Sequence, residues 1–222
     1  MEHMQTLFQK FMSWWTRFEY RYLIKDKAVK KGSFFDAFFN IRRAQAIQSS
    51  PKRVLWVGNS RIHGGEPLIN VLPDTLDLGV SGSKLEDWID RGVDTISPAM
   101  PVAVVEDLGG NNFLAGQDVD HVFALKQQWI MMLSKITKHI LVLEVVYLGP
   151  GHDDVNAKLV DFNNRIAALP NVSIIRLNDM MAPQGVMLPQ FDAGDHIHHS
   201  PLAYTAGYMP RVQQRLAELG IV

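Results

Sequence analysis

The 222-residue chain contains no cysteine. This absence excludes disulfides, a thiolate nucleophile and cysteine-ligated zinc sites, and it leaves the redox compartment undetermined. No run reaches the roughly 18 apolar residues that a membrane span needs. The first residues, MEHMQTLFQKFMSWW, lack the basic patch and following apolar stretch of a secretory signal. We therefore expect a cytoplasmic protein, with a peripheral position at a membrane as the alternative.

The chain also lacks a dominant charge and the common nucleotide-binding motifs. It carries 22 Lys and Arg against 23 Asp and Glu, which gives no general case for a nucleic-acid partner. Neither the dinucleotide fingerprint G-x-G-x-x-G nor the phosphate loop ending in G-K-[ST] occurs, and the lipase-type elbow G-x-S-x-G is missing too. A nucleotide cofactor is therefore not expected.

Residues 1–50 differ from the rest of the chain. They carry nine basic and four acidic residues, whereas the remaining 172 carry thirteen and nineteen. Apolar side chains recur there at helical spacing and share one stripe: Met4, Phe8, Phe11, Trp15, Phe18 and Tyr22. Such a stripe packs on its own domain or on a second copy of the chain, or it lies on an anionic membrane surface or docks a partner. The sequence predicts a helical extension over residues 1–50, with homo-oligomer or peripheral membrane contact through residues 1–45.

Residues 51–222 alternate between short apolar runs and longer amphipathic ones. The apolar runs predict strands over residues 53–58, 75–80, 102–107, 139–148 and 172–177. The segments between and after them predict helices at about 64–71, 84–97, 118–137, 153–168 and 201–218. The strand runs largely lack alternating polar residues, as expected for strands that are covered on both faces. This pattern predicts an α/β domain with a five-stranded parallel sheet between two layers of helices.

The loops after the predicted strands are the expected place for a site, because ligands bind beyond the carboxyl ends of parallel strands. Ser60 follows the first strand in VLWVGNSRIHGG and is either a helix cap or a nucleophile. A serine nucleophile needs a base, a group that orients the base and donors for an oxyanion. Asp195 and His198, three apart in DHIH, can supply the first two. Gly82 can supply a backbone N–H and Asn111 a side-chain amide.

Four blocks in this order, VGNS, LGVSGS, LGGNN and DHIH, resemble those of the SGNH (GDSL-type) hydrolase family over about residues 53–217. The resemblance implies a flavodoxin-like three-layer α/β/α sandwich. It also implies that Ser60 is the nucleophile, that His198 is its base and that Asp195 orients the base. The oxyanion donors would be Gly82, Asn111 and the N–H of Ser60.

Two positions depart from the family pattern. Asn59 and Asn112 stand where the family usually has Asp, and asparagine can still form hydrogen bonds in the same turns. Together with His63 and His152, they are possible substrate contacts. An alternative is a metallohydrolase that uses Asp192, Asp195, the neighbouring histidines at 196 and 199, and residues 152–154, but it leaves Ser60, Gly82 and Asn111 without a role.

The expected function is a serine ester hydrolase without a metal or other cofactor. Polar site loops favour removal of a small, acetyl-like acyl group from a polar carrier such as a glycan, and the aromatic extension favours a lipid or a membrane-held substrate. An acyltransferase or a lipid or thioester hydrolase of the same fold is the first alternative. The second is a binding or assembly protein with a degenerate hydrolase-like body.

Overall fold

The computed structural model describes residues 31–51 and 53–222, so the aromatic stripe predicted over residues 4–22 lies outside the described residues. The chain divides into two compact units, Met1–Phe38 and Phe39–Val222. We call the second unit the body. It begins earlier than the predicted boundary at residue 50, because the last turns of helix α2 (Lys31–Gln48) belong to it. Phe39 packs edge-on against Trp88, with ring centroids 4.9 Å apart.

The body is built on a parallel sheet of five strands: β1 (Val54–Gly58), β2 (Thr75–Asp77), β3 (Ala103–Asp107), β4 (His139–Leu143) and β5 (Ser173–Ile175). Their order is β2-β1-β3-β4-β5. Val54 is in register with Thr75 on one side and with Ala103 on the other. Every residue of β1, β2 and β3 is buried, which explains why these runs lack polar alternation.

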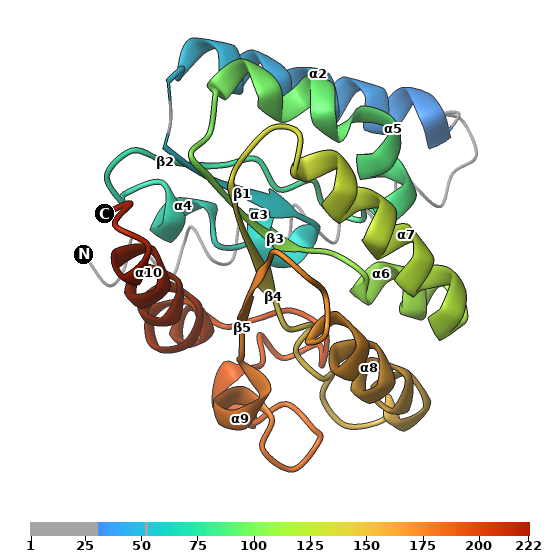
Figure 1. Ribbon diagram of the computed structural model, residues 1–222. Helices are drawn as coiled ribbons and strands as arrows, with labels where there is room; N and C mark the ends of the chain where they lie inside the picture. The colour runs from blue at the N-terminus through green and yellow to red at the C-terminus, as the bar shows by residue number, and fades with distance from the viewer. Residues whose placement is uncertain (1–30, 52) are drawn as a thin grey trace. The chain divides into compact units, whose positions relative to one another are not determined.

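Helices cover both faces of the sheet (Figure 1). One face carries α5 (Leu85–Ile96), α7 (Val119–Leu133) and α8 (Asp153–Ile166), and the other carries α4 (Glu66–Ile69) and α10 (Met209–Glu218). Short elements complete the body: α3 (Ser60–His63), η2 (Ser97–Ala99), α6 (Gly110–Leu114), α9 (Asn178–Met181), η3 (Pro189–Phe191) and the π-helical η4 (Ala203–Tyr208). The predicted three-layer, flavodoxin-like α/β/α fold is confirmed. Within the described part of the chain, no helix is long and apolar enough to span a bilayer.

The strand predicted over 139–148 is shorter in the structure, because β4 ends at Leu143. The Glu144 N–H still donates to the Ile175 carbonyl of β5, but the backbone groups of Val145 and Leu148, both buried, bind side-chain amides instead of a neighbouring strand. The amide of Asn163 exchanges two hydrogen bonds with the backbone of Val145, and that of Asn156 does the same with Leu148. An apolar run therefore extends past the sheet edge toward the loops that carry the candidate site.

Candidate active site

Ser60 lies at a tight turn between β1 and α3. Asn59 caps α3, since its side-chain oxygen accepts a hydrogen bond from the Arg61 N–H at 2.8 Å. The side-chain amide of Asn59 donates to the carbonyl of Asp107 at the end of β3. A Cβ atom at Gly58 would come within 2.6 Å of that same carbonyl oxygen, so the turn has room only for glycine there. The turn thus places a partly exposed Ser60 at the carboxyl edge of the sheet.

The loop before η4 brings an imidazole to Ser60. One carboxylate oxygen of Asp195 accepts hydrogen bonds from the backbone N–H groups of Ile197 and His198, at 3.0 and 2.8 Å. The other lies 2.6 Å from His198 Nδ1. Because a carboxylate only accepts, Nδ1 carries a proton, and in the neutral ring Nε2 is then the acceptor. His198 Nε2 lies 2.9 Å from Ser60 Oγ, across 138 positions of sequence.

The electrostatics of this loop keep Asp195 ionised. Burial by itself raises the pKa of the Asp195 carboxyl, but the hydrogen bonds from the His198 ring and backbone outweigh burial and hold the pKa well below its ordinary value. The side chains of His198 and Asp195 are 32% and 44% exposed, respectively. The structure therefore brings together the three residues predicted for a triad, at a position that is open to solvent.

The two other predicted oxyanion donors lie on the adjacent loops. Gly82 has a positive φ of 76°, which glycine adopts without strain. Asn111, in α6, donates from its amide to the Ser83 carbonyl at 2.9 Å, which fixes the orientation of that amide. The Gly58 carbonyl accepts from the Val80 N–H at 2.9 Å and from the Ser83 hydroxyl at 3.3 Å. The loop of residues 79–83, which we call the oxyanion loop, is thus bound directly to the strand that ends beside Ser60.

Arg61, which the sequence patterns did not single out, is a buried residue that links the candidate catalytic loops through hydrogen bonds. It is only 4% exposed. Its guanidinium donates to the Val146 carbonyl at 3.0 Å and to the Ile197 carbonyl at 3.3 Å. The hydroxyl of Tyr204 donates to the backbone carbonyl of Arg61 at 2.5 Å. The residue next to Ser60 is therefore bonded to the residue next to His198.

A second buried group continues this support. The Tyr208 hydroxyl lies 3.3 Å from a carboxylate oxygen of Asp107 and 3.0 Å from Nδ1 of His199. Burial raises the pKa of Asp107, against the lowering effect of the Arg61 charge. Burial, helped by the Arg61 charge, lowers the pKa of His199 well below its ordinary value, so that ring is neutral. The spacing of Tyr204 and Tyr208 by four was the one sequence signal for this cluster, since it places both on one side of a helix.

Two predicted substrate contacts require correction. Asn59 and Asn112 are 2% and 0% exposed. The Asn112 amide donates to Glu86 and Gln117 at 2.7 and 2.6 Å, and its oxygen accepts from the Leu85 N–H. Both asparagines sit where the family pattern has Asp, and both are occupied in holding turns, so neither side chain reaches the surface on which a substrate would bind.

The two predicted histidine contacts lie nearer the surface. Nδ1 of His63 is 2.6 Å from the Arg42 guanidinium and 3.2 Å from the Glu66 carboxylate, so its ring is already engaged on one side. His152 is partly exposed at the start of α8.

The acidic and histidine residues of the last loop form separate pairs. Asp192 lies 2.6 Å from Nδ1 of His196, while Asp195 pairs with His198. Among residues 31–51 and 53–222, no group of three or more such side chains is arranged to hold a metal ion. The alternative hypothesis of a metallohydrolase therefore finds no cluster of metal ligands within the described residues.

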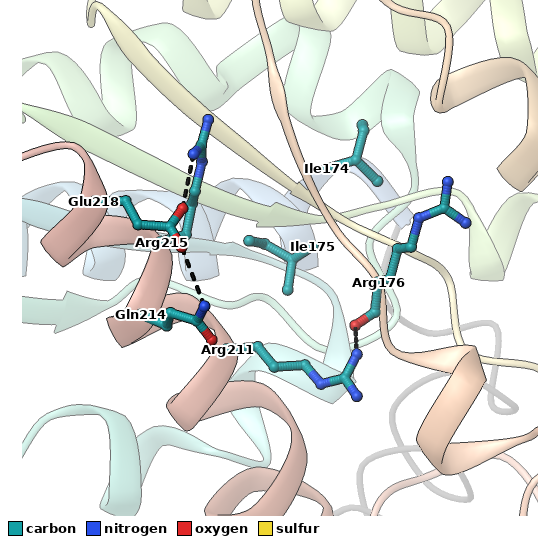
Figure 2. Close-up of a pocket in the computed structure, with 7 residues that line it drawn as sticks. All are labelled: Ile174, Ile175, Arg176, Arg211, Gln214, Arg215 and Glu218. Carbon is teal, nitrogen blue, oxygen red and sulfur yellow. Dashed lines mark hydrogen bonds and ion pairs between the residues drawn. The ribbon is translucent and has the colours of Figure 1, made fainter.

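A surface hollow between β5 and α10 contains none of the candidate catalytic residues (Figure 2). It is lined by Ile174, Ile175, Arg176, Arg211, Gln214, Arg215 and Glu218. Two of its arginines are already paired, Arg211 with Asp179 at 2.7 Å and Arg215 with Glu218 at 2.8 Å.

Comparisons with known proteins agree with this architecture. No family model and no curated protein matches the chain, but solved structures do. A GDSL-like lipase from Bacteroides thetaiotaomicron superposes with a TM-score of 0.71 at 18% identity, over 82% of this chain and 99% of the other. A variant of an acetyl-xylooligosaccharide esterase from Geobacillus superposes with a TM-score of 0.58 at 17% identity, over 77% of this chain and 95% of the other. A family 3 carbohydrate esterase from Talaromyces cellulolyticus superposes with a TM-score of 0.57 at 13% identity, over 76% of this chain and 97% of the other. The body therefore has the fold of GDSL-type hydrolases, and the resemblance inferred from the four blocks is confirmed at the level of fold.

Proposed function

We propose that the chain is a serine ester hydrolase of the SGNH type. The observation that carries the proposal is the hydrogen-bonded chain from Ser60 Oγ to His198 Nε2 at 2.9 Å and from His198 Nδ1 to Asp195 at 2.6 Å. A serine bonded to a base that is itself oriented by a carboxylate is the arrangement that activates a hydroxyl for attack. The fold shared with GDSL-type hydrolases adds support.

The mechanism follows from these positions. Ser60 Oγ attacks the ester carbonyl carbon while His198 Nε2 takes the hydroxyl proton, and Asp195 stabilises the resulting imidazolium. The oxyanion accepts hydrogen bonds from the N–H groups of Ser60 and Gly82 and from the Asn111 amide. Collapse of the intermediate breaks the ester bond, and His198 protonates the departing alcohol. Water then attacks the acyl-serine with His198 as base, which releases the carboxylic acid and restores Ser60.

We infer that the substrate is a small acyl ester on a polar carrier such as a glycan. The partial exposure of His198 and Asp195 allows a bulky carrier to approach an open site. The loops that surround Ser60 are rich in glycine and polar side chains rather than in large apolar ones. Two structural neighbours are esterases whose names refer to carbohydrates, which supports the same substrate class.

A panel of aryl esters from acetyl to long-chain acyl, together with an acetylated oligosaccharide, tests the proposal. We expect the acetyl esters to be cleaved fastest and Ser60→Ala to lower turnover by about a thousandfold or more. Ser134→Ala, which changes an exposed serine after α7, is the matched control and should leave turnover unchanged. Wild-type turnover in Ser60→Ala would contradict the proposal. Preference for long chains, or transfer of the acyl group to an added alcohol, would instead favour the lipid hydrolase or the acyltransferase.

A further inference from the structure

Helix α2 lies outside the region of family resemblance, but it contributes a buried arginine to the body. Arg42 is 5% exposed, whereas its neighbour Arg43 is exposed. Arg42 Nε donates to the carbonyl oxygen of Gly79 at 2.9 Å. Gly79 is the first residue of the oxyanion loop, three positions before Gly82.

The backbone of Gly79 is held on both sides. Its N–H donates to a carboxylate oxygen of the buried Asp77 at 2.7 Å, and its carbonyl accepts from Arg42. A Cβ atom at this position would come within 2.4 Å of the backbone nitrogen of His63, so the loop packs directly against the short helix that begins at Ser60. The next N–H, of Val80, donates to Gly58. The contacts of Gly79 therefore fix the position of the backbone at the start of the oxyanion loop.

The remaining donors of Arg42 hold its guanidinium in place. They reach the two carboxylate oxygens of Glu66 at 3.2 and 3.1 Å and the side-chain oxygen of Gln45 at 2.8 Å. Nδ1 of His63 lies 2.6 Å from the same guanidinium. A two-pronged bond to a carboxylate fixes the plane of an arginine as well as its position. Arg42 thus connects the oxyanion loop with α3 and α4.

We propose that Arg42 is a positioning residue for the oxyanion loop, which makes the end of α2 a functional part of the active site. This inference rests on the proposed function. Oxyanion donors stabilise the transition state only when they are aligned before the reaction, and displacements of about half an ångström are enough to reduce that effect. By holding the Gly79 carbonyl, Arg42 keeps the Gly82 N–H at a fixed position relative to Ser60.

Arg42→Ala with Arg43→Ala as the matched control tests this role on the full chain. For Arg42→Ala we expect kcat to fall by about tenfold or more, with KM within about twofold of wild type, because only the transition state uses the oxyanion donors. Arg43→Ala should retain wild-type kcat and KM. Methylguanidinium added to Arg42→Ala should restore part of the lost kcat and should not affect the wild type. Arg42→Lys should be intermediate, since an ammonium can reach one acceptor but cannot replace the fork.

Two results would overturn the inference: a folded Arg42→Ala with wild-type kcat, or a loss that raises KM as much as it lowers kcat and that methylguanidinium does not restore. If Arg42→Ala does not fold, Arg42→Lys decides by the same division between kcat and KM. The proposed function is checked separately by turnover of the wild type and of Ser60→Ala. An active wild type with an unaffected Arg42→Ala would remove Arg42 and leave the hydrolase, whereas an inactive wild type would remove both.

Discussion

At the scale of single residues, the proposed nucleophile Ser60 and the proposed base His198 are positioned through their sequence neighbours. Asn59, before Ser60, is bonded to the Asp107 carbonyl, and Arg61, after it, is bonded to the Ile197 carbonyl. His199, after His198, is anchored on Tyr208. Ser60 and His198 are therefore supported from the same buried polar network, which restricts their relative motion and preorganises the site for attack.

Asn111 should affect turnover rather than substrate binding. Its amide is oriented by the Ser83 carbonyl, and loss of one oxyanion donor typically raises the barrier by roughly 2.7 to 4 kcal/mol. We expect Asn111→Ala to lower kcat by about a hundredfold with little change in KM, as steady-state kinetics on an acetyl ester would measure. Gln127→Ala, which removes an exposed amide on α7, is the control. Unchanged turnover would remove Asn111 from the site.

Glu66 should make the stability of the protein depend on pH in the acid range. Burial by itself raises its pKa, but hydrogen bonds from His63 and Arg42 outweigh burial and lower the pKa from 4.5 to about 2. Between pH 4.5 and about 2, Glu66 is protonated in the unfolded chain but still ionised in the folded protein. The contribution of the ionised Glu66 to the free energy of unfolding is therefore complete above pH 4.5 and is lost as the pH falls toward 2.

Denaturant unfolding at a series of pH values measures this effect. In Glu66→Gln, the free energy of unfolding should fall less steeply with acidification below about pH 4.5 than in the wild type. Asp90→Asn, at a position whose side chain is 70% exposed, is the control and should follow the wild-type curve. Equal slopes in wild type and Glu66→Gln would contradict the assignment.

The sequence allowed the candidate triad to be predicted but not its supports. Ser60, Asp195 and His198 stand in short motifs at loops whose place follows from strand periodicity. Arg61 and Arg42 carry no comparable signal, because a buried arginine is recognisable only from partners far away in the chain. The backbone partner of Arg61 at Ile197 is 136 positions distant, and that of Arg42 at Gly79 is 37.

At the scale of elements, the loop that carries Asp195 and His198 is fitted against the segment that follows β4. The Gly149 N–H donates to the His196 carbonyl at 2.8 Å. A Cβ atom at Gly149 would lie 2.8 Å from the Cβ of His196, closer than such atoms approach in proteins, and 3.0 Å from its Cα. The apolar pattern continued through this segment and so predicted a longer strand. It could not reveal that the side-chain amides of Asn156 and Asn163 replace the strand partner there.

Gly149→Ala should therefore displace the loop and slow the reaction. The new methyl group would meet the Cβ and Cα of His196, and rotation of the side chain moves neither atom away, so the loop must move by a few tenths of an ångström. Misplacement of the proposed catalytic base, His198, is costly. We expect kcat to fall by about tenfold or more while circular dichroism shows a retained fold. Wild-type kcat in this variant would mean that the loop tolerates the shift.

At the scale of the whole molecule, the body begins at Phe39, before the domain boundary that the sequence predicted at residue 50. A chain that starts at Phe39 keeps the Phe39–Trp88 contact and Arg42, and we expect it to fold and to cleave small soluble esters within about twofold of the full chain. A chain that starts at residue 51 loses both. Its free energy of unfolding should fall by on the order of 3 kcal/mol or more, since Phe39 is 3% exposed. Thermal unfolding and turnover of the two truncations would reveal the difference, and equal behaviour would contradict this boundary.

The same truncation tests the proposed membrane contact of the aromatic extension. The full chain should sediment with anionic vesicles, and the chain that starts at Phe39 should not. Equal sedimentation of the two would exclude a membrane role for the missing residues and would favour packing on the body or on a second copy of the chain.

The proposed function depends on Ser60 as a nucleophile that His198 activates. A fluorophosphonate probe reacts with activated serines, and peptide mass spectrometry then identifies the labelled residue. We expect one modified residue, Ser60, in the wild type and no labelling in folded His198→Ala. A folded wild-type protein that is not labelled at Ser60, or labelling that is unaffected by His198→Ala, would contradict activation of Ser60 by His198.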